Sequence, residues 1–396
     1  MSIQNPAGLL SAQVGSSKIL SRNFSHTSRS AAKMPPSLGI LDDHLNTSAH
    51  HFAHIPSTQL RITTFHDTIV PSNQEELARL VERLKPFELL STMRERTAFP
   101  ASLLRQLPNL RLLLATGTQF ETFDLAAAKE LGITVVAAPG RGRTDDQSQP
   151  LWPNIRQGGG HPTVQHTWGL ILALARNIAT DDALLKTDGG WQSGLATGLA
   201  GRTLGVVGLG RLGAAVARIA HLAWGMKVLC WSENMTQEKA DRAARDAGIV
   251  HDGGDAVFRA VSKEELLRSS DVVSLHYVLS DRSKGMIGAR ELELMKQSAL
   301  LINTSRGPLI DQAALLNTLE AGRIRGAALD VYDIEPLPLT SPWRRPNYWG
   351  RDGRSLLVAT PHMGYVDEGL MNAWYAETAE NVDRWLDGRE ILHRLA

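Results

Sequence analysis

The stretch TLGVVGLGRLG, residues 203–213, joins a short apolar run to three spaced glycines. The apolar run predicts a buried strand, and the following AAVARIAHLA predicts a helix. Gly208 permits a tight turn, Gly210 lets a phosphate approach the backbone, and Gly213 lets the helix pack on the strand. Free N–H groups at the helix start favour an anion. The stretch therefore predicts a dinucleotide-binding turn, made by Gly208, Gly210, Arg211, Leu212 and Gly213.

The end of the next predicted strand, VLCWSENMT, indicates which dinucleotide binds. An acid about 20 residues beyond the glycines commonly binds the ribose 2′-hydroxyl of NAD. Ser232 stands where that acid is expected, and Glu233 follows it. Glu233 favours NAD by its charge, whereas Ser232 leaves NADP open. We expect NAD.

Strand-like runs alternate with helix-like segments along the chain, in two series. The first series is LGIL (38–41), LRITTF (60–65), FELLST (87–92), LRLLLAT (110–116) and ITVVAA (133–138). The second is TLGVVG (203–208), MKVLCW (226–231), DVVSLH (271–276), ALLINT (299–304), GAALDVY (326–332) and SLLVAT (355–360). This alternation predicts an α/β protein with two parallel sheets, the second doubly wound. The helix-like VQHTWGLILALARNI lies between the series, and LMNAWYAETAENVDRWLDG closes the chain.

Composition excludes several classes of protein. The 396 residues include 42 Lys and Arg against 41 Asp and Glu, so attraction to nucleic acid or to an anionic membrane is not indicated. No apolar run reaches the roughly 18 residues that span a bilayer. The single cysteine, Cys230, lies in an apolar run and excludes an intrachain disulfide.

The first 33 residues differ from the rest in composition. They are rich in Ser, carry several Lys and Arg, and contain no acid; the first acid of the chain is Asp42. This composition is typical of a mitochondrial transit peptide. A disordered leader, or a true start at Met34 with a cytoplasmic protein, remains the alternative.

Two polar stretches interrupt the alternation: residues 140–160 and residues 343–355. Both are predicted to be loops because they are rich in Gly, Pro or charged residues. Long loops inside a compact domain are functional or inserted, and the sequence leaves both explanations open.

Three polar side chains follow strands of the second series: Arg306 in INTSRGPLID, Glu335 in ALDVYDIEP, and His362 in ATPHMG. In an open α/β sheet, ligands bind beyond the carboxyl ends of the strands. A histidine can donate or accept a proton near neutral pH, and the planar fork of an arginine suits a carboxylate. These residues therefore predict acid–base chemistry on a carboxylate substrate at the mouth of the nucleotide site.

These motifs, in this order, resemble the D-isomer-specific 2-hydroxyacid dehydrogenases over nearly the whole chain after about residue 38. LAGRTLGVVGLGRLG, DLAAAKELGITVVAAPG and HTWGLILALARNI match as well. The resemblance implies a catalytic triad of Arg306, Glu335 and His362, and further cofactor contacts at Thr304, Asp330 and Gly364. It also implies a homodimer.

The resemblance implies a Rossmann nucleotide domain at 166–364 and a smaller, flavodoxin-like substrate domain at 38–165 and 365–396. Gly117 and Thr118 match a loop that binds the substrate carboxylate through backbone N–H groups. Arg94 and Arg96 stand where some members contact an anionic substrate tail. A surface salt bridge is the alternative for each arginine.

Two positions depart from the family pattern. Gln165 stands where Glu is common, and LHYVLS (275–280) lacks the usual proline. Neither position belongs to the expected triad, although Gln165 bears on contacts between domains.

The predicted function is hydride transfer between NAD(P) and a D-2-hydroxy acid, with no metal. Glyoxylate, hydroxypyruvate and 3-phosphoglycerate are the substrate types that the resemblance suggests. A formate dehydrogenase-like enzyme is a second interpretation, against which Glu335 counts because those relatives replace this glutamate. An NAD-sensing, corepressor-like binding protein is a third.

Overall fold

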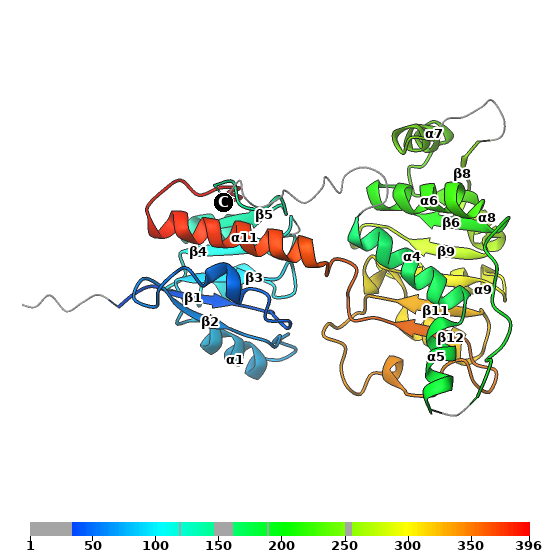
Figure 1. Ribbon diagram of the computed structural model, residues 1–396, viewed down its shortest axis with the longest axis horizontal. Helices are drawn as coiled ribbons and strands as arrows, with labels where there is room; N and C mark the ends of the chain where they lie inside the picture. Colours follow the sequence, from blue (N-terminus) through cyan, green and yellow to red (C-terminus); the bar gives the residue numbers. More distant parts are fainter. Residues whose placement is uncertain (1–33, 119, 146–160, 188–189, 250–255) are drawn as a thin grey trace, which may run out of the picture. The chain divides into compact units, whose positions relative to one another are not determined.

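The computed structural model describes residues 34–118, 120–145, 161–187, 190–249 and 256–396. The expected leader, residues 1–33, and most of the loop at 140–160 lie outside these ranges. Residues 36–396 form one compact unit, which contains two parallel sheets (Figure 1). The α/β class predicted from the alternating pattern is thus confirmed.

The first sheet has five strands in the order β2-β1-β3-β4-β5, all parallel. Its strands are β1 (Ser37–Ile40), β2 (Arg61–Thr64), β3 (Leu89–Thr92), β4 (Leu112–Thr116) and β5 (Thr134–Ala138). Its helices are η1 (Ala49–Phe52), α1 (Gln74–Leu84), α2 (Ala101–Leu104), α3 (Leu125–Glu130) and, from the other end of the chain, α11 (Glu368–Leu386). This strand order is that of flavodoxin-like folds.

Alternation of side chains along each strand covers both faces of this sheet. Leu113 packs into a cluster with residues of α1, α2 and α3, whereas its neighbours Leu112 and Leu114 pack into a cluster with η1 and α11. The helix α11 contacts β4 and β5, as Figure 1 shows. The carboxyl-terminal helix therefore covers one face of the sheet that the first third of the chain forms. The exact domain boundaries stay a prediction.

The second sheet has seven parallel strands in the order β12-β11-β10-β9-β6-β7-β8. Its strands are β6 (Thr203–Val207), β7 (Lys227–Trp231), β8 (Phe258–Ala260), β9 (Val272–Leu275), β10 (Leu300–Asn303), β11 (Gly326–Leu329) and β12 (Leu356–Ala359). The order reverses at β6, so this is the doubly wound Rossmann arrangement with one strand added at the edge. β8 was not predicted; it has only three residues, too few for a periodic pattern.

Helices cover both faces of the second sheet. They are α4 (Pro162–Ala175), α5 (Ile178–Thr187), α6 (Arg211–Trp224), α7 (Gln237–Asp246), α8 (Lys263–Ser269), α9 (Ala289–Leu294) and α10 (Gln312–Glu320), with the 3-10 turns η2 (Gly307–Leu309) and η3 (Pro342–Arg344). Val206 packs with α4 and α6, whereas the adjacent Val207 packs with α8, α9 and α10. Because both faces are buried, the strands read as continuous apolar runs.

Both predicted loops make specific contacts where they are described. The N–H of Gly140 donates to Glu377 Oε2 at 2.8 Å, and the N–H of Thr144 donates to Glu380 Oε2 at 2.6 Å, so α11 anchors the start of the first loop. In the second loop, Trp343 is buried and stacks on Trp349 at 5.9 Å. The described parts of both stretches therefore belong to the packed fold.

Candidate active site

The glycine turn between β6 and α6 has the geometry that its sequence predicts. Gly208 has φ +96°, and a Cβ there would lie 2.5 Å from the carbonyl oxygen of His276. A Cβ on Gly213 would lie 2.1 Å from the carbonyl oxygen of Gly208. A Cβ on Gly210, which caps α6, would meet no heavy atom within 4 Å. The turn is thus closed on the protein side and open at Gly210, which fits the approach of a pyrophosphate to the helix start.

Ser232 and Glu233 directly follow β7, the neighbour of β6. Ser232 is half-buried and Glu233 is exposed. Tyr277, which follows β9, stacks on Trp231 with 6.0 Å between ring centroids. The Tyr277 hydroxyl lies 3.4 Å from the N–H of Glu233. The structure therefore places both predicted ribose-reading residues beside the glycine turn, at the carboxyl edge of the sheet.

Three polar residues follow three adjacent strands at the same edge. Arg306 follows β10, Glu335 follows β11, and His362 follows β12. The Nδ1 atom of His362 lies 2.5 Å from Glu335 Oε2. The other oxygen, Oε1, accepts a hydrogen bond from the N–H of Tyr332 at 2.9 Å. The carboxylate is therefore fixed at both oxygens, and it holds one nitrogen of the imidazole.

Asp330, at the end of β11, shapes the backbone that carries His362. Its carbonyl oxygen accepts from the N–H of His362 at 2.8 Å, and its carboxylate accepts from the N–H groups of Met363 and Gly364 at 2.7 and 2.9 Å. His362 has φ +55°, a conformation that costs free energy outside glycine. These hydrogen bonds hold the histidine in that conformation, so the structure gives Asp330 a positioning role beside its predicted cofactor contact.

Asp330 is fully buried and its carboxylate has further partners. Thr360 Oγ1 donates to Oδ1 at 2.6 Å, and His166 Nε2 lies 3.1 Å from the same oxygen. Burial raises the pKa of Asp330, but the hydrogen bonds from His166 and Thr360 outweigh it and the pKa lies below its usual range. His166 comes from α4, the helix that the sequence placed between the two series. His166 belongs to the HTWGLILALARNI segment, but no pattern in the sequence predicts that it contacts Asp330.

Thr304 and Gly364, the remaining predicted cofactor contacts, are both buried near this network. Thr304 Oγ1 lies 2.8 Å from Thr167 Oγ1 on α4. A Cβ on Gly364 would lie 3.1 Å from Asp330 Oδ2. Contact with a dinucleotide stays a prediction for each residue.

Arg306 contacts both its own loop and Glu95, which follows a strand of the first sheet. Its NH1 donates to the carbonyl oxygen of Ser305 at 2.8 Å, and its NH2 donates to Glu95 Oε1. Asn303 Nδ2 donates to the carbonyl oxygen of Arg306 at 2.9 Å and fixes its backbone. Glu95 follows β3 of the first sheet and was absent from the predicted site. Charge alternation in MRERT was its only signal in the sequence.

Arg94 and Arg96 flank Glu95, and both lie against aromatic rings. The guanidinium carbon of Arg94 lies 4.7 Å from the centroid of the Tyr365 ring, and that of Arg96 lies 5.7 Å from it. Burial, partly offset by Glu95, lowers the pKa of Arg94. Arg94 has φ +54°, with its N–H donating to Thr116 Oγ1 at 2.9 Å.

Gly117 and Thr118 follow β4, as the predicted carboxylate loop requires. The N–H of Gly117 already donates to the carbonyl oxygen of Ala138 at 2.9 Å. This N–H group is therefore engaged within the sheet. Thr118 is exposed, and its role as a carboxylate contact stays a prediction.

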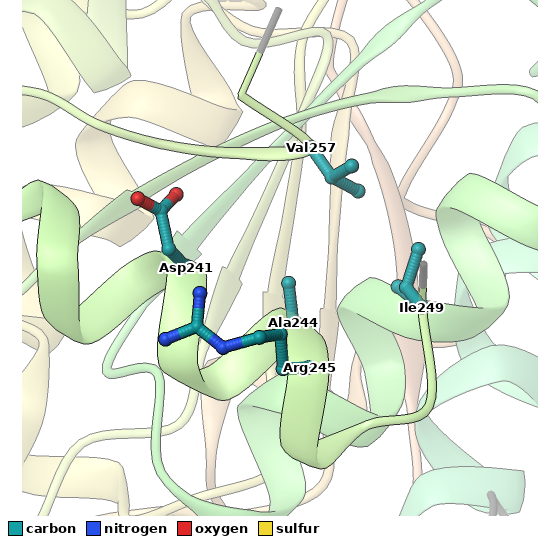
Figure 2. Close-up of a pocket in the computed structure, with 5 residues that line it drawn as sticks. All are labelled: Asp241, Ala244, Arg245, Ile249 and Val257. Atoms are coloured by element: carbon teal, nitrogen blue, oxygen red, sulfur yellow. The ribbon is translucent and has the colours of Figure 1, made fainter. Parts of the chain in front are cut away.

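A cavity of about 270 Å³ lies elsewhere, against α7 and the residues that precede β8 (Figure 2). It is lined by Asp241, Ala244, Arg245, Ile249 and Val257. None of these residues belongs to the predicted site. Within the described ranges, no group of three His, Cys, Asp or Glu side chains is arranged to hold a metal ion. Over the same residues, no helix is long and apolar enough to cross a membrane.

A Rossmann sheet, an open glycine turn, and a histidine–carboxylate pair with an arginine at its carboxyl edge define a class of protein: a nicotinamide dinucleotide-dependent dehydrogenase. Residues 168–364 match the D-isomer specific 2-hydroxyacid dehydrogenases in their NAD binding domain. The chain belongs to this family. It is accordingly an NAD(P)-dependent enzyme that acts on the CH–OH group of 2-hydroxy acids.

Named relatives agree with this assignment. A glyoxylate reductase of Aeropyrum pernix is 35% identical over 65% of this chain and 73% of its own length. A glycerate dehydrogenase of Methylorubrum extorquens is 33% identical over 78% of this chain and 86% of its own. The crystal structure of a phosphoglycerate oxidoreductase from Vibrio cholerae has a TM-score of 0.69 and 32% identity, covering 89% of this chain and 99% of that one.

Proposed function

We propose that this enzyme interconverts a D-2-hydroxy acid and its 2-keto acid with His362, Glu335 and Arg306 as its catalytic residues. The observation that carries the proposal is the contact between His362 Nδ1 and Glu335 Oε2, at the ends of β12 and β11. Arg306 follows β10, which pairs with β11. Carboxyl ends of adjacent parallel strands share one edge of the sheet, where ligands of this fold bind.

The chemistry follows from the three side chains. NADH held at the turn of Gly208, Gly210 and Gly213 would supply the hydride that C2 of the keto acid accepts. His362 donates a proton from Nε2 to the carbonyl oxygen, which becomes the hydroxyl group, so charge does not accumulate there. Glu335 holds Nδ1 and stabilises the imidazole that donates the proton. Arg306 presents its guanidinium to the carboxylate and the adjacent carbonyl oxygen, which orients the substrate for the transfer.

The activities for which the relatives are named suggest glyoxylate, hydroxypyruvate and phosphoglycerate-type acids as substrates. Glu233 favours NADH over NADPH, because a carboxylate beside the ribose accepts a hydrogen bond from a 2′-hydroxyl and repels a 2′-phosphate. A panel of 2-keto acids assayed with NADH and NADPH in parallel tests both points. We expect turnover with NADH at a higher kcat/KM; absence of turnover with every acid would contradict the proposal.

Two other functions have less support. Formate oxidation requires no proton donor for a hydroxyl oxygen, so the fixed His362–Glu335 pair favours a hydroxy acid instead. A nucleotide-sensing binding protein would bind NADH without turnover, and the same assay separates it from an enzyme.

We also propose that residues 1–33 direct the protein to mitochondria and that it is a homodimer. The acid-free, Arg- and Ser-rich leader supports the first point. A fusion of residues 1–33 to a fluorescent protein tests it, and cytosolic fluorescence would contradict it. Light scattering on the purified protein tests the second, for which a monomer mass is the contrary result.

A further inference from the structure

The carboxylate of Glu95 lies on the guanidinium of Arg306, the proposed substrate-binding arginine. Glu95 Oε1 accepts from Arg306 NH2, and Oε2 lies 3.5 Å from Arg94 Nε. The side chains of Glu95 and Arg306 are 21% and 32% exposed, so the pair is partly withdrawn from water. A third acidic group beside Glu335 and Asp330 therefore stands at the site.

Glu95 carries its charge in this setting. Burial raises its pKa, but Arg306, then Arg94, and more weakly His362 outweigh burial, and the pKa lies below its usual range. The carboxylate is thus ionised at neutral pH. A partly buried charge acts over several ångströms because water screens it weakly.

Glu95 also pairs with Arg94, a cation that would otherwise suit an anionic substrate tail. Arg94 is partnered by Glu95 and packed on Tyr365 at 4.7 Å and Trp374 at 5.9 Å. Arg96, the other candidate for such a tail, lies over the same Tyr365 ring, and its charge also acts on the buried Asp42. NH2 of Arg306 donates to Glu95 and NH1 donates to the carbonyl oxygen of Ser305, so part of the guanidinium is already engaged. The proposed function assigns its remaining N–H groups to the C1 carboxylate.

We propose that Glu95 is a specificity-determining residue that selects 2-keto acids carrying only the C1 carboxylate and disfavours those with a second anionic group. A tail carboxylate or phosphate that enters beside Arg306 meets the fixed charge of Glu95. This inference rests on the proposed function, and it narrows the substrate class from the three acid types to those with a neutral or hydroxylated tail, such as glyoxylate and hydroxypyruvate.

The test compares two substrates of equal chain length that differ in tail charge, 2-oxobutanoate and oxaloacetate, each with NADH. The wild type is expected to favour 2-oxobutanoate in kcat/KM at least tenfold. In Glu95→Gln, which keeps the shape but removes the charge, the ratio of kcat/KM for oxaloacetate to that for 2-oxobutanoate should rise about tenfold, or about 1.4 kcal/mol. KM for oxaloacetate should account for most of that change.

Glu82→Gln is the matched control. Glu82 is an exposed glutamate on α1 of the same sheet, with a side chain that is 75% exposed, and its removal should leave the ratio unchanged. A wild type that favours oxaloacetate overturns the inference without use of any variant. So does an unchanged ratio in Glu95→Gln. Both results leave the proposed function intact, whereas a wild type that reduces no keto acid contradicts the function itself and the inference with it.

Discussion

Nδ1 of His362 lies 2.5 Å from Oε2 of Glu335, and this contact distinguishes the two nitrogens of the ring. A ring nitrogen that donates to a carboxylate must carry a hydrogen, so in the proposed mechanism the opposite nitrogen, Nε2, exchanges a proton with substrate. In the described part of the chain, no hydrogen bond engages Nε2. The pair therefore resembles the histidine–carboxylate unit of other acid–base enzymes.

Replacing the carboxylate of this pair should slow the chemistry and spare binding. In Glu335→Gln, the amide can still contact Nδ1 but cannot stabilise a protonated ring. We expect kcat to fall by about 10²- to 10⁴-fold, the usual contribution of acid–base catalysis, with NADH affinity unchanged. Steady-state kinetics and NADH fluorescence measure the two quantities. Glu130→Gln, an exposed glutamate on α3, is the control; a kcat equal to the wild type in Glu335→Gln would remove this residue from the mechanism.

The second and third glycines of the turn, Gly210 and Gly213, should respond differently to an added methyl group. The Cβ of Gly213→Ala would lie 2.1 Å from the carbonyl oxygen of Gly208, so the helix must shift. We expect a loss of about 1–3 kcal/mol in the free energy of unfolding. The Cβ of Gly210→Ala meets nothing within 4 Å, so that variant should fold normally and bind NADH more weakly.

Denaturant unfolding and NADH titration of both variants separate these effects. If Gly210→Ala bound NADH as tightly as the wild type, the pyrophosphate would not approach the backbone at this position. Equal stability losses in the two variants would contradict the packing argument.

Asp330 should matter for both stability and catalysis, because its carboxylate accepts from the N–H groups of Met363 and Gly364. In Asp330→Asn, one oxygen becomes a donor and faces an N–H donor. We expect a loss of about 1–3 kcal/mol in the free energy of unfolding and a lower kcat, because His362 loses its fixed backbone. Unfolding by urea and the assay with NADH measure both. A variant as stable as the wild type would contradict the role of this network.

Glu377 on α11 should make stability depend on pH. Burial outweighs the hydrogen bonds from Gly140 and Arg141 and raises the pKa of Glu377 to about 7, from an ordinary value of 4.5. A raised folded pKa means that the protonated form fits the fold, so its stabilising contribution is complete below about pH 4.5 and is lost as the pH rises to about 7. The nearby carboxylates of Glu380 and Asp383 are present in both the wild type and a Glu377→Gln variant, so a comparison of the two isolates Glu377.

Glu377→Gln cannot ionise, so it escapes this loss. Its free energy of unfolding, relative to the wild type, should rise by about 3 kcal/mol between pH 4.5 and pH 7 and then level off. Urea unfolding of both proteins across this range measures the difference. A difference that stays constant with pH would show that burial does not control this carboxyl.

The sequence predicts those features that arise from local patterns. Apolar runs predict eleven of the strands, and the spacing of Gly208, Gly210 and Gly213 predicts the turn between β6 and α6. His362, Glu335 and Arg306 are predicted to lie together because each stands in the loop that follows a strand of one parallel sheet, and the family resemblance adds their catalytic roles.

Long-range relationships leave no such pattern. Glu95 contacts Arg306 across 211 positions of sequence, beside Arg94 with its φ of +54°. Asp330 was predicted as a cofactor contact, but its hold on residues 362–364 depends on how β11 and β12 pair. β8 has three residues, too few for periodicity to reveal. These features depend on tertiary packing, which a single sequence does not express.

The most direct test of the account follows a labelled hydride and measures how much its transfer depends on the imidazole of His362. Wild type and His362→Asn are each given glyoxylate and NADH that carries deuterium at both C4 positions of the nicotinamide, and glycolate is analysed by mass spectrometry. We predict deuterium at C2 of glycolate from the wild type, and a rate about 10²- to 10⁴-fold lower for His362→Asn at unchanged NADH affinity. Glycolate without the label, or full activity in His362→Asn, would contradict the central claim that this imidazole serves hydride transfer to a 2-keto acid.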